Sequence, residues 1–221
     1  MNLKVPQNEF RLKKIGQRGK ITIWLVDGAA IRRDLDSEFT NFGQHYRFNF
    51  IPEYEFWIDK EAVPDERRFF IDHLLTEWRL MKKGVSYSEA TDIADTKERS
   101  ERIKSLDFRK ILDKKGRPDV AKFHLRLLEK TPDGVSVWLV DGKLVRTIFD
   151  VEFTEGGHDL IYDFVPKNEV WIDNDVEEEE RKFVILHETY ERELMKKGML
   201  YPQAHKKASR VEWQARQADL L

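Results

Sequence analysis

A histidine and two glutamates in the C-terminal half of the chain are spaced for metal chemistry. They are His187, Glu188 and Glu191, in the sequence His-Glu-Thr-Tyr-Glu. Residues four apart share one face of a helix, so a helix here would let His187 and Glu191 bind the same ion. Glu188 would then stand beside that ion, in position to take a proton from water. One interpretation of this spacing is a metal site with its own general base.

A second segment supplies residues that could complete this site. His205 and Glu212 lie along a stripe of alanines if residues 202–217 form a helix. A tight connection makes the two helices antiparallel neighbours, which brings Glu212 level with His187. We expect His205 as the third ligand. Glu212 is expected either as a fourth ligand or as the acceptor that orients the imidazole of His187.

The pattern of apolar residues places this chemistry in the protein interior. At 100° per residue, His187 and Glu191 fall in the middle of the apolar arc of their helix, and Glu188 falls on its rim. The arc consists of Phe183, Val184, Leu186, Tyr190, Leu194 and Met195. A carboxylate buried without a partner is strongly unfavourable, so a partner is required. Two interpretations stay open: a metal site, or a structural network that pairs each histidine with a glutamate of the other helix.

The candidate site belongs to the second copy of a tandem repeat. Residues 24–102 align without a gap on residues 138–216, and 33 of the 79 aligned positions are identical. A repeat of this length is a duplicated domain rather than a solenoid unit. We predict a first repeat over 1–105, a linker over 106–121 and a second repeat over 122–221.

The first repeat keeps only part of the chemical set. His73, Glu77 and Glu98 align with the first histidine and the two candidate carboxylates of the second repeat. Leu74 stands in place of the expected base, and Thr91 in place of the histidine on the last helix. We therefore expect any catalysis in the second repeat, with a degenerate counterpart in the first.

His158 is a further candidate. It follows Gly156-Gly157, and two glycines allow the backbone to approach a ligand closely. An exposed loop histidine is the favoured interpretation, and a metal ligand or substrate contact is the alternative. The first repeat has Gln44 at this position.

The strands and helices that hold these residues can be predicted from the sequence pattern of each repeat independently. In the second repeat we expect strands over 123–128, 135–140, 143–149 and 169–173, with a hairpin turn at Asp141-Gly142. Helices are expected over about 177–197 and 202–217. Each repeat is thus predicted to be an α+β domain, an antiparallel β-sheet or meander followed by a C-terminal helical hairpin.

Composition narrows the function classes. Lys and Arg total 39 and Asp and Glu 41, a net charge of −2, so there is no strong sign of nucleic-acid binding. Cysteine is absent, which excludes disulfides, Cys-ligated zinc and a thiol nucleophile. No apolar run reaches the length of a membrane span and no secretory leader is visible, so we expect a cytoplasmic protein.

The motifs together resemble known domains. Val-Asp-Gly, Gly-Gly-His, Trp-Ile-Asp, the His187–Glu191 helix and Tyr201-x-x-Ala-His205 resemble small uncharacterised domains of bacterial, archaeal, phage and plasmid proteins. The helix motif alone is similar to that of zincin-like metallopeptidases, with Glu191 where these have a second histidine. That resemblance implies zinc at His187 and Glu191 with Glu188 as base. A carboxylate ligand also admits manganese or iron.

The resulting expectation is a metal-dependent hydrolase, peptidase-like, with its site in the second repeat. Its substrate is unknown, and a peptide is one candidate. The alternative is a non-catalytic binding or scaffold protein in which the two repeats pack as an intramolecular pseudo-dimer and buried His–Glu pairs lock the helices.

Overall fold

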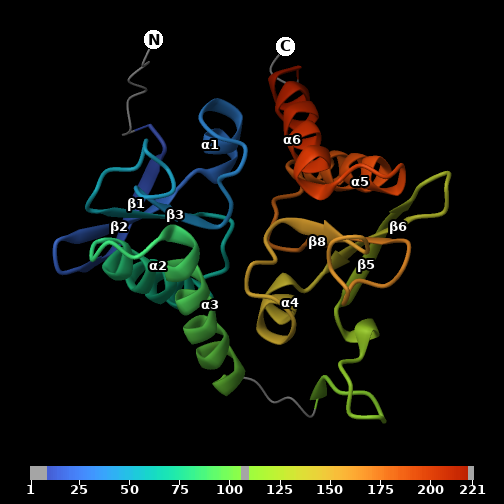
Figure 1. The fold of residues 1–221 in the computed structure, drawn as a ribbon, viewed down its shortest axis with the longest axis horizontal. Helices are drawn as coiled ribbons and strands as arrows, with labels where there is room; N and C mark the ends of the chain where they lie inside the picture. The colour runs from blue at the N-terminus through green and yellow to red at the C-terminus, as the bar shows by residue number, and fades with distance from the viewer. Residues whose placement is uncertain (1–8, 106–109, 219–221) are drawn as a thin grey trace. The chain divides into compact units, whose positions relative to one another are not determined.

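The computed structural model describes residues 9–105 and 110–218, which fall into two compact units, Met1–Lys104 and Ser105–Leu221 (Figure 1). The described part of each unit carries a four-stranded sheet, and a helical hairpin follows its last strand. The first unit comprises β1 (Arg11–Arg18), β2 (Ile21–Val26), α1 (Gly28–Asp34), β3 (Phe42–Gln44), β4 (Glu55–Asp59), α2 (Arg67–Met81) and α3 (Tyr87–Lys104). The predicted α+β class and the two similar domains are confirmed.

The second unit repeats this order of elements. It comprises the 3-10 turn η2 (Val120–Lys122), β5 (His124–Lys130), β6 (Ser136–Val140), α4 (Gly142–Ile148), β7 (Gly156–His158), β8 (Glu169–Asp173), α5 (Arg181–Lys196) and α6 (Tyr201–Ala218). Of the segment predicted as a linker, residues 106–109 lie outside the described residues. Ile111 and Val120 pack in a hydrophobic cluster of the second unit.

Each sheet is mixed, so the predicted antiparallel meander is wrong. The strand orders are β1-β2-β4-β3 and β5-β6-β8-β7. The outer pairs are antiparallel, but β6 runs parallel to β8, with Ser136 opposite Glu169 and Val140 opposite Asp173. β2 and β4 are parallel in the same way. A parallel pair needs a crossover rather than a hairpin, and α4 lies in that crossover.

The error originates at Asp141-Gly142, which was predicted as a hairpin turn. The Asp141 carboxylate accepts a hydrogen bond from the backbone N–H of Leu144 at 2.9 Å, so it caps the N-terminus of α4. A type I′ hairpin turn requires positive φ at both central residues, whereas Asp141 has φ −73°. Residues 143–149, predicted as a strand, therefore lie mainly in a helix.

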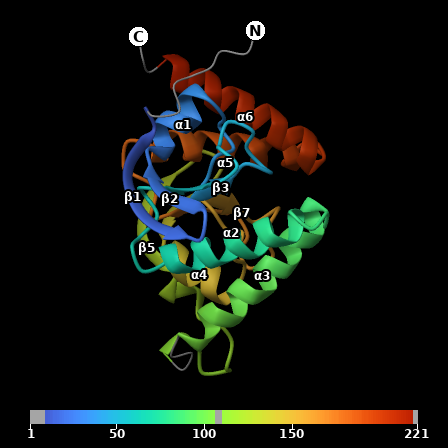
Figure 2. The same ribbon diagram turned by 90° about the vertical axis from the view of Figure 1, so that its left-hand side faces the viewer.

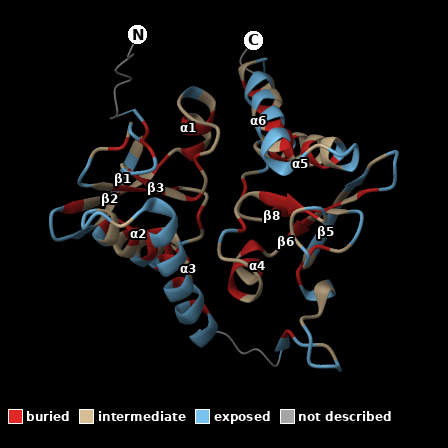
Figure 3. Cartoon of the chain, viewed as in Figure 1, coloured by how far each residue is buried: buried red, intermediate tan, exposed pale blue. Residues whose placement is uncertain are grey.

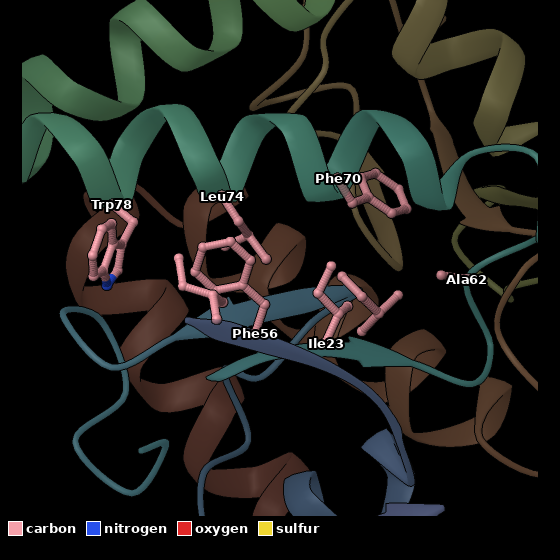
Figure 4. Close-up of a cluster of buried hydrophobic side chains, with 8 residues drawn as sticks. Ile23, Phe56, Ala62, Phe70, Leu74 and Trp78 are labelled. Carbon is pink, nitrogen blue, oxygen red and sulfur yellow. The ribbon is translucent and has the colours of Figure 1, made fainter. Parts of the chain in front are cut away.

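Alternating side chains divide the core between the two faces of each sheet. In β4, Phe56 and Ile58 belong to the cluster that contains Phe70 and Leu74 of α2, and Figure 4 shows Phe56 below this helix. Trp57 packs in the cluster on the opposite face, which includes Ile31 of α1. The second unit repeats this division between the two faces of its sheet. Figure 3 shows that the central strand β8 is almost entirely buried, whereas much of the helix α3 in the first unit is exposed. A helical hairpin is thereby held against one face of each sheet, and α2 and α3 lie side by side in Figure 2.

The helix bounds in the second unit differ from prediction mainly at one end. α6 begins and ends within one residue of the predicted helix, but α5 starts at Arg181 rather than Glu177. The glutamates before it form a turn, and the last of them, Glu180, contacts Arg216 of α6. Among the described residues, none of the helices is both long and apolar enough to span a membrane.

Candidate metal site

The α5–α6 hairpin brings together the residues singled out on both helices. The helices approach closely because Ala204 and Ala208 of α6 are small and fully buried. His187 and Glu191 point from α5 toward His205 and Glu212 of α6, and the pairs His187–Glu212 and Glu191–His205 form as the helical register predicted.

Three potential ligand atoms converge at the centre of this hairpin. His187 Nε2 lies 3.2 Å from His205 Nδ1 and 3.5 Å from Glu191 Oε2, and His205 Nδ1 lies 2.8 Å from Glu191 Oε2. Ligand atoms bound tetrahedrally to zinc at 2.0–2.1 Å are about 3.3 Å from one another. The side chain of His205 is 33% exposed while the other two are buried, so the group opens to solvent beside His205.

The two oxygens of Glu212 are both engaged, which fits the orienting role better than that of a fourth ligand. Its Oε2 lies 2.8 Å from His187 Nδ1, and its Oε1 accepts hydrogen bonds of 2.9 and 2.8 Å from Arg216. Arg216 also contacts Glu180. A carboxylate on Nδ1 keeps the proton there and leaves the lone pair of His187 on Nε2, where a metal can bind.

Sequence reasoning missed Arg216 and Glu180. A signal was present: the aligned positions of the first repeat hold the same residues, Arg102 and Glu66, and Arg216 lies four residues after Glu212 on the same helix face. Charged residues that recur at aligned positions of both copies are candidates for an ion pair, and these residues form one in each unit.

His158 is fully buried, so the expectation of an exposed loop histidine is wrong. It lies on β7, and its Nε2 is 3.0 Å from Glu191 Oε1. The Gly156-Gly157 pair is part of the sheet rather than a loop. A Cβ on Gly157 would lie 2.4 Å from the ring of Tyr162, and one on Gly156 would lie 3.0 Å from the carbonyl oxygen of Trp171. The glycines therefore serve close packing, and this brings the histidine against α5.

Glu188 lies between α5 and β7. Its Cγ would be 3.1 Å from a Cβ on Gly156, so the absence of a side chain there leaves room for it. Glu188 forms with His158 and Glu191 a second group of potential ligand atoms within 4.8 Å of one another. Burial raises the pKa of Glu188, although the nearby imidazoles of His187 and His158 oppose this.

Hydrogen bonds at the centre of the site favour a proton on His187. Burial alone would lower the pKa of His187, but hydrogen bonds to Glu191 and Glu212 outweigh it and raise the pKa to about 11. Burial opposes ionisation of Glu191, yet its hydrogen bonds to His158, His187 and His205 hold its pKa well below the usual range. A divalent cation bound by the same atoms would replace that proton, so metal binding would release it to solvent.

The first unit forms the corresponding scaffold without the ligand set. His73 Nδ1 lies 3.0 Å from Glu98, and Glu77 accepts hydrogen bonds from Gln44 at 2.8 Å and Thr91 at 2.9 Å. Leu74, at the position of the expected base, is buried in the hydrophobic core. In the part of the chain that the structure describes, both groups of three side chains able to hold a metal ion lie in the second unit.

Comparison of the chain with protein-family models, with curated proteins and with solved structures found no match.

Proposed function

We propose that the second unit is a metal-dependent hydrolase in which His187, Glu191 and His205 bind one divalent ion. The convergence of three ligand atoms at 2.8–3.5 Å from one another is the observation that carries this proposal. Two imidazole nitrogens and one carboxylate oxygen form a donor set that zinc accepts, and manganese or iron are the alternatives. The exposed edge of His205 gives the group access to solvent.

In this proposal the chain's own residues divide the work. Glu212 and Arg216 keep the His187 ring in place with its Nε2 lone pair toward the ion. When bound, the ion would supply Lewis acidity, which makes water a stronger acid. Glu188 takes the proton from the attacking water and returns it to the leaving group, so that it begins and ends the cycle ionised. A peptide or ester carbonyl is the proposed substrate class.

Metal content tests the first half of the proposal. The purified chain is titrated with zinc, manganese and iron(II), and bound metal is measured by elemental analysis after dialysis. We expect one ion per chain, lost in His187→Ala and His205→Ala and retained in the matched first-unit variant His73→Ala. Absence of metal under all three conditions, or equal loss in His73→Ala, would contradict the proposal.

Glu188→Gln tests the second half. The amide keeps the shape of the side chain but cannot take a proton, so metal binding should persist while hydrolysis falls by about 100-fold or more. Activity is measured on a panel of peptide and ester substrates, with circular dichroism as the check on folding. Hydrolysis by the variant at the rate of the unaltered chain would remove Glu188 from the mechanism.

A non-catalytic binding or scaffold protein is the second candidate. It is favoured by the first unit, where Gln44 and Thr91 hold Glu77 and His73 pairs with Glu98 in the same fold. Histidines could fill the same structural role in the second unit. A chain that binds none of the three metals would support this candidate.

A further inference from the structure

His158 touches the proposed ligand Glu191, and its second ring nitrogen shows which role it plays. The backbone N–H of Leu160 lies 3.2 Å from His158 Nδ1. A backbone N–H can only donate, so Nδ1 is the acceptor and carries no proton. In a neutral imidazole the proton then sits on Nε2, which lies 3.0 Å from Glu191 Oε1. His158 therefore donates a hydrogen bond to Glu191.

In the first unit, Gln44 takes the place of this histidine. The nitrogen of its amide can only donate a hydrogen bond and the oxygen can only accept one. The backbone N–H of Tyr46 donates to Gln44 Oε1 at 3.4 Å, and Gln44 Nε2 donates to Glu77 at 2.8 Å. Gln44, Tyr46 and Glu77 align with His158, Leu160 and Glu191. The reverse orientation of the amide would set its NH₂ against a backbone N–H and its oxygen against a carboxylate. The fold thus presents a donor on one side and an acceptor on the other, and His158 in its Nε2–H form satisfies both.

From these contacts we infer that His158 is a positioning residue that holds Glu191 in one-oxygen coordination, so that the metal has three protein ligands and an open fourth position. This rests on the proposed function. His158 draws Oε1 of Glu191 toward β7, and Oε2 is the oxygen that faces His187 and His205. Glu212 does not fill the fourth position, because it contacts His187 at Nδ1, the ring nitrogen that points away from the proposed ion at Nε2. Three protein ligands with an open position characterise catalytic zinc sites, whereas four characterise structural ones.

The competing role for His158 is that of a ligand, either to the same ion or to a second ion shared with Glu188 and Glu191. Coordination through Nε2 would move the proton to Nδ1, where it would point at the N–H of Leu160. Two donors would then face each other in a buried position, which is unfavourable.

Two substitutions of His158 separate these roles. Glutamine can donate to Glu191 and accept from Leu160, as Gln44 does, but it is a poor zinc ligand. We expect the zinc dissociation constant of His158→Gln to stay within about 3-fold of the unaltered chain, and that of His158→Ala to rise about 10–100-fold. Gln44→Ala is the matched control and should leave zinc affinity unchanged. Zinc loss in His158→Gln as complete as in His187→Ala would overturn the inference, as would unchanged affinity in His158→Ala.

The absorption spectrum of the cobalt(II)-loaded chain tests the coordination of the ion directly, which a measurement of stability does not. The cobalt(II)-loaded chain should give the spectrum of a four-coordinate site that changes when acetohydroxamate enters the open position, and His158→Gln should give the same spectrum and the same change. A spectrum insensitive to acetohydroxamate would contradict the open position.

The tautomer can be tested without metal. Nitrogen-15 correlation spectra of the imidazole rings should show His158 as the neutral Nε2–H form. A proton on Nδ1 would overturn the inference while leaving the proposed function standing. Failure of the unaltered chain to bind zinc, with the Nε2–H tautomer present, would instead count against the proposed function.

Discussion

Glu77 and Glu191 occupy the same place in two similar helical hairpins, yet different groups surround them. Glu77 receives hydrogen bonds from an amide and a hydroxyl, whereas Glu191 is contacted by imidazoles from β7, α5 and α6. An amide and a hydroxyl satisfy a buried carboxylate but bind zinc poorly, while imidazole can do both. The difference indicates that the fold places donors around this glutamate in both units, and that, among the described residues, only the second unit uses donors that could also bind a metal.

A second set of contacts is the same in both units. His73, Glu98 and Arg102 form one buried chain of ion pairs, and the residues aligned with them form the other. Each arginine also reaches a glutamate just before the first helix of its hairpin. This part of the network is therefore scaffold, and it exists whether or not a ligand set is present.

The strand beside the helix differs as well. Phe42 of β3 packs against His73 and Phe70, with ring centroids 5.1 and 4.8 Å apart. The aligned residue is Gly156, and the space near it is taken by Glu188. The absence of a side chain on the neighbouring strand thus leaves space for a carboxylate next to the site.

The largest expected effect is a loss of folding stability when the arginine of either His–Glu–Arg chain is removed. Arg216→Met and Arg102→Met each remove a guanidinium from two carboxylates while keeping an apolar stem; of these carboxylates, Glu66, Glu98 and Glu212 are buried and Glu180 is partly buried. Removing one partner of a buried ion pair costs about 3–5 kcal/mol in the free energy of unfolding, and we expect this cost for both variants. Denaturant unfolding with amide exchange as a unit-specific probe measures it. A cost below about 1 kcal/mol in one unit alone would show that the two networks are not equivalent.

The next largest effect is expected on zinc affinity, when His205 and Thr91, which are aligned but differ between the units, are substituted for one another. His205→Thr gives the second unit the residue of the first, so it should lower zinc affinity by more than about 100-fold, about 2.7 kcal/mol. Folding should be retained, because Thr91 donates to Glu77 in the same fold. The reciprocal change Thr91→His places a third candidate ligand beside His73 and Glu77.

Isothermal titration calorimetry with zinc compares the two substitutions. We expect binding to disappear in His205→Thr and a second, weaker ion to appear in Thr91→His. Zinc binding by His205→Thr with unchanged affinity would show that His205 is not a ligand. A Thr91→His chain that still binds a single ion would mean that the first unit lacks more than this one group.

Helical periodicity was sufficient to predict most of the candidate site. Because α5 and α6 are regular, the angles along each helix and the antiparallel register predict the pairs His187–Glu212 and Glu191–His205, and the structure contains both. The helical hairpin and the two-unit organisation follow from the same patterns, and the internal alignment showed which groups differ between the units.

The contributions of the strands could not be predicted in the same way. Asp141-Gly142 is compatible with either a hairpin turn or a helix cap, and only the parallel pairing of β6 with β8 decides between them. The position of His158 depends on the sheet in the same way. This histidine lies on β7, which pairs with β8, and the pairing places it against Glu191 of α5. Arg216 was missed because a charged residue near a helix end is usually solvated, and its burial depends on where Glu180 lies.

The smallest effect is a pH dependence that belongs to the first unit. Burial would lower the pKa of His73, but the ion pair with Glu98 outweighs it and raises the pKa, while the pKa of Glu98 is lowered by His73 and Arg102 despite its burial. The contribution of His73 is therefore complete below its ordinary value of 6.5 and is lost as the pH rises through the raised value. That of Glu98 is complete above 4.5 and is lost as the pH falls through the lowered value.

The pair should therefore stabilise the fold most between about pH 4.5 and 6.5, by on the order of 1 kcal/mol. The measurement is the free energy of unfolding of the unaltered chain minus that of His73→Gln, taken from denaturant titrations across the pH range. We expect this difference to be largest inside the window and to shrink on both sides of it. Zinc should leave the difference unchanged, because His73 belongs to the unit without a ligand set. A difference that is constant from acid to alkaline pH would mean that His73 is neutral in the folded chain, and that the resemblance between the two His–Glu–Arg chains is one of position and not of charge.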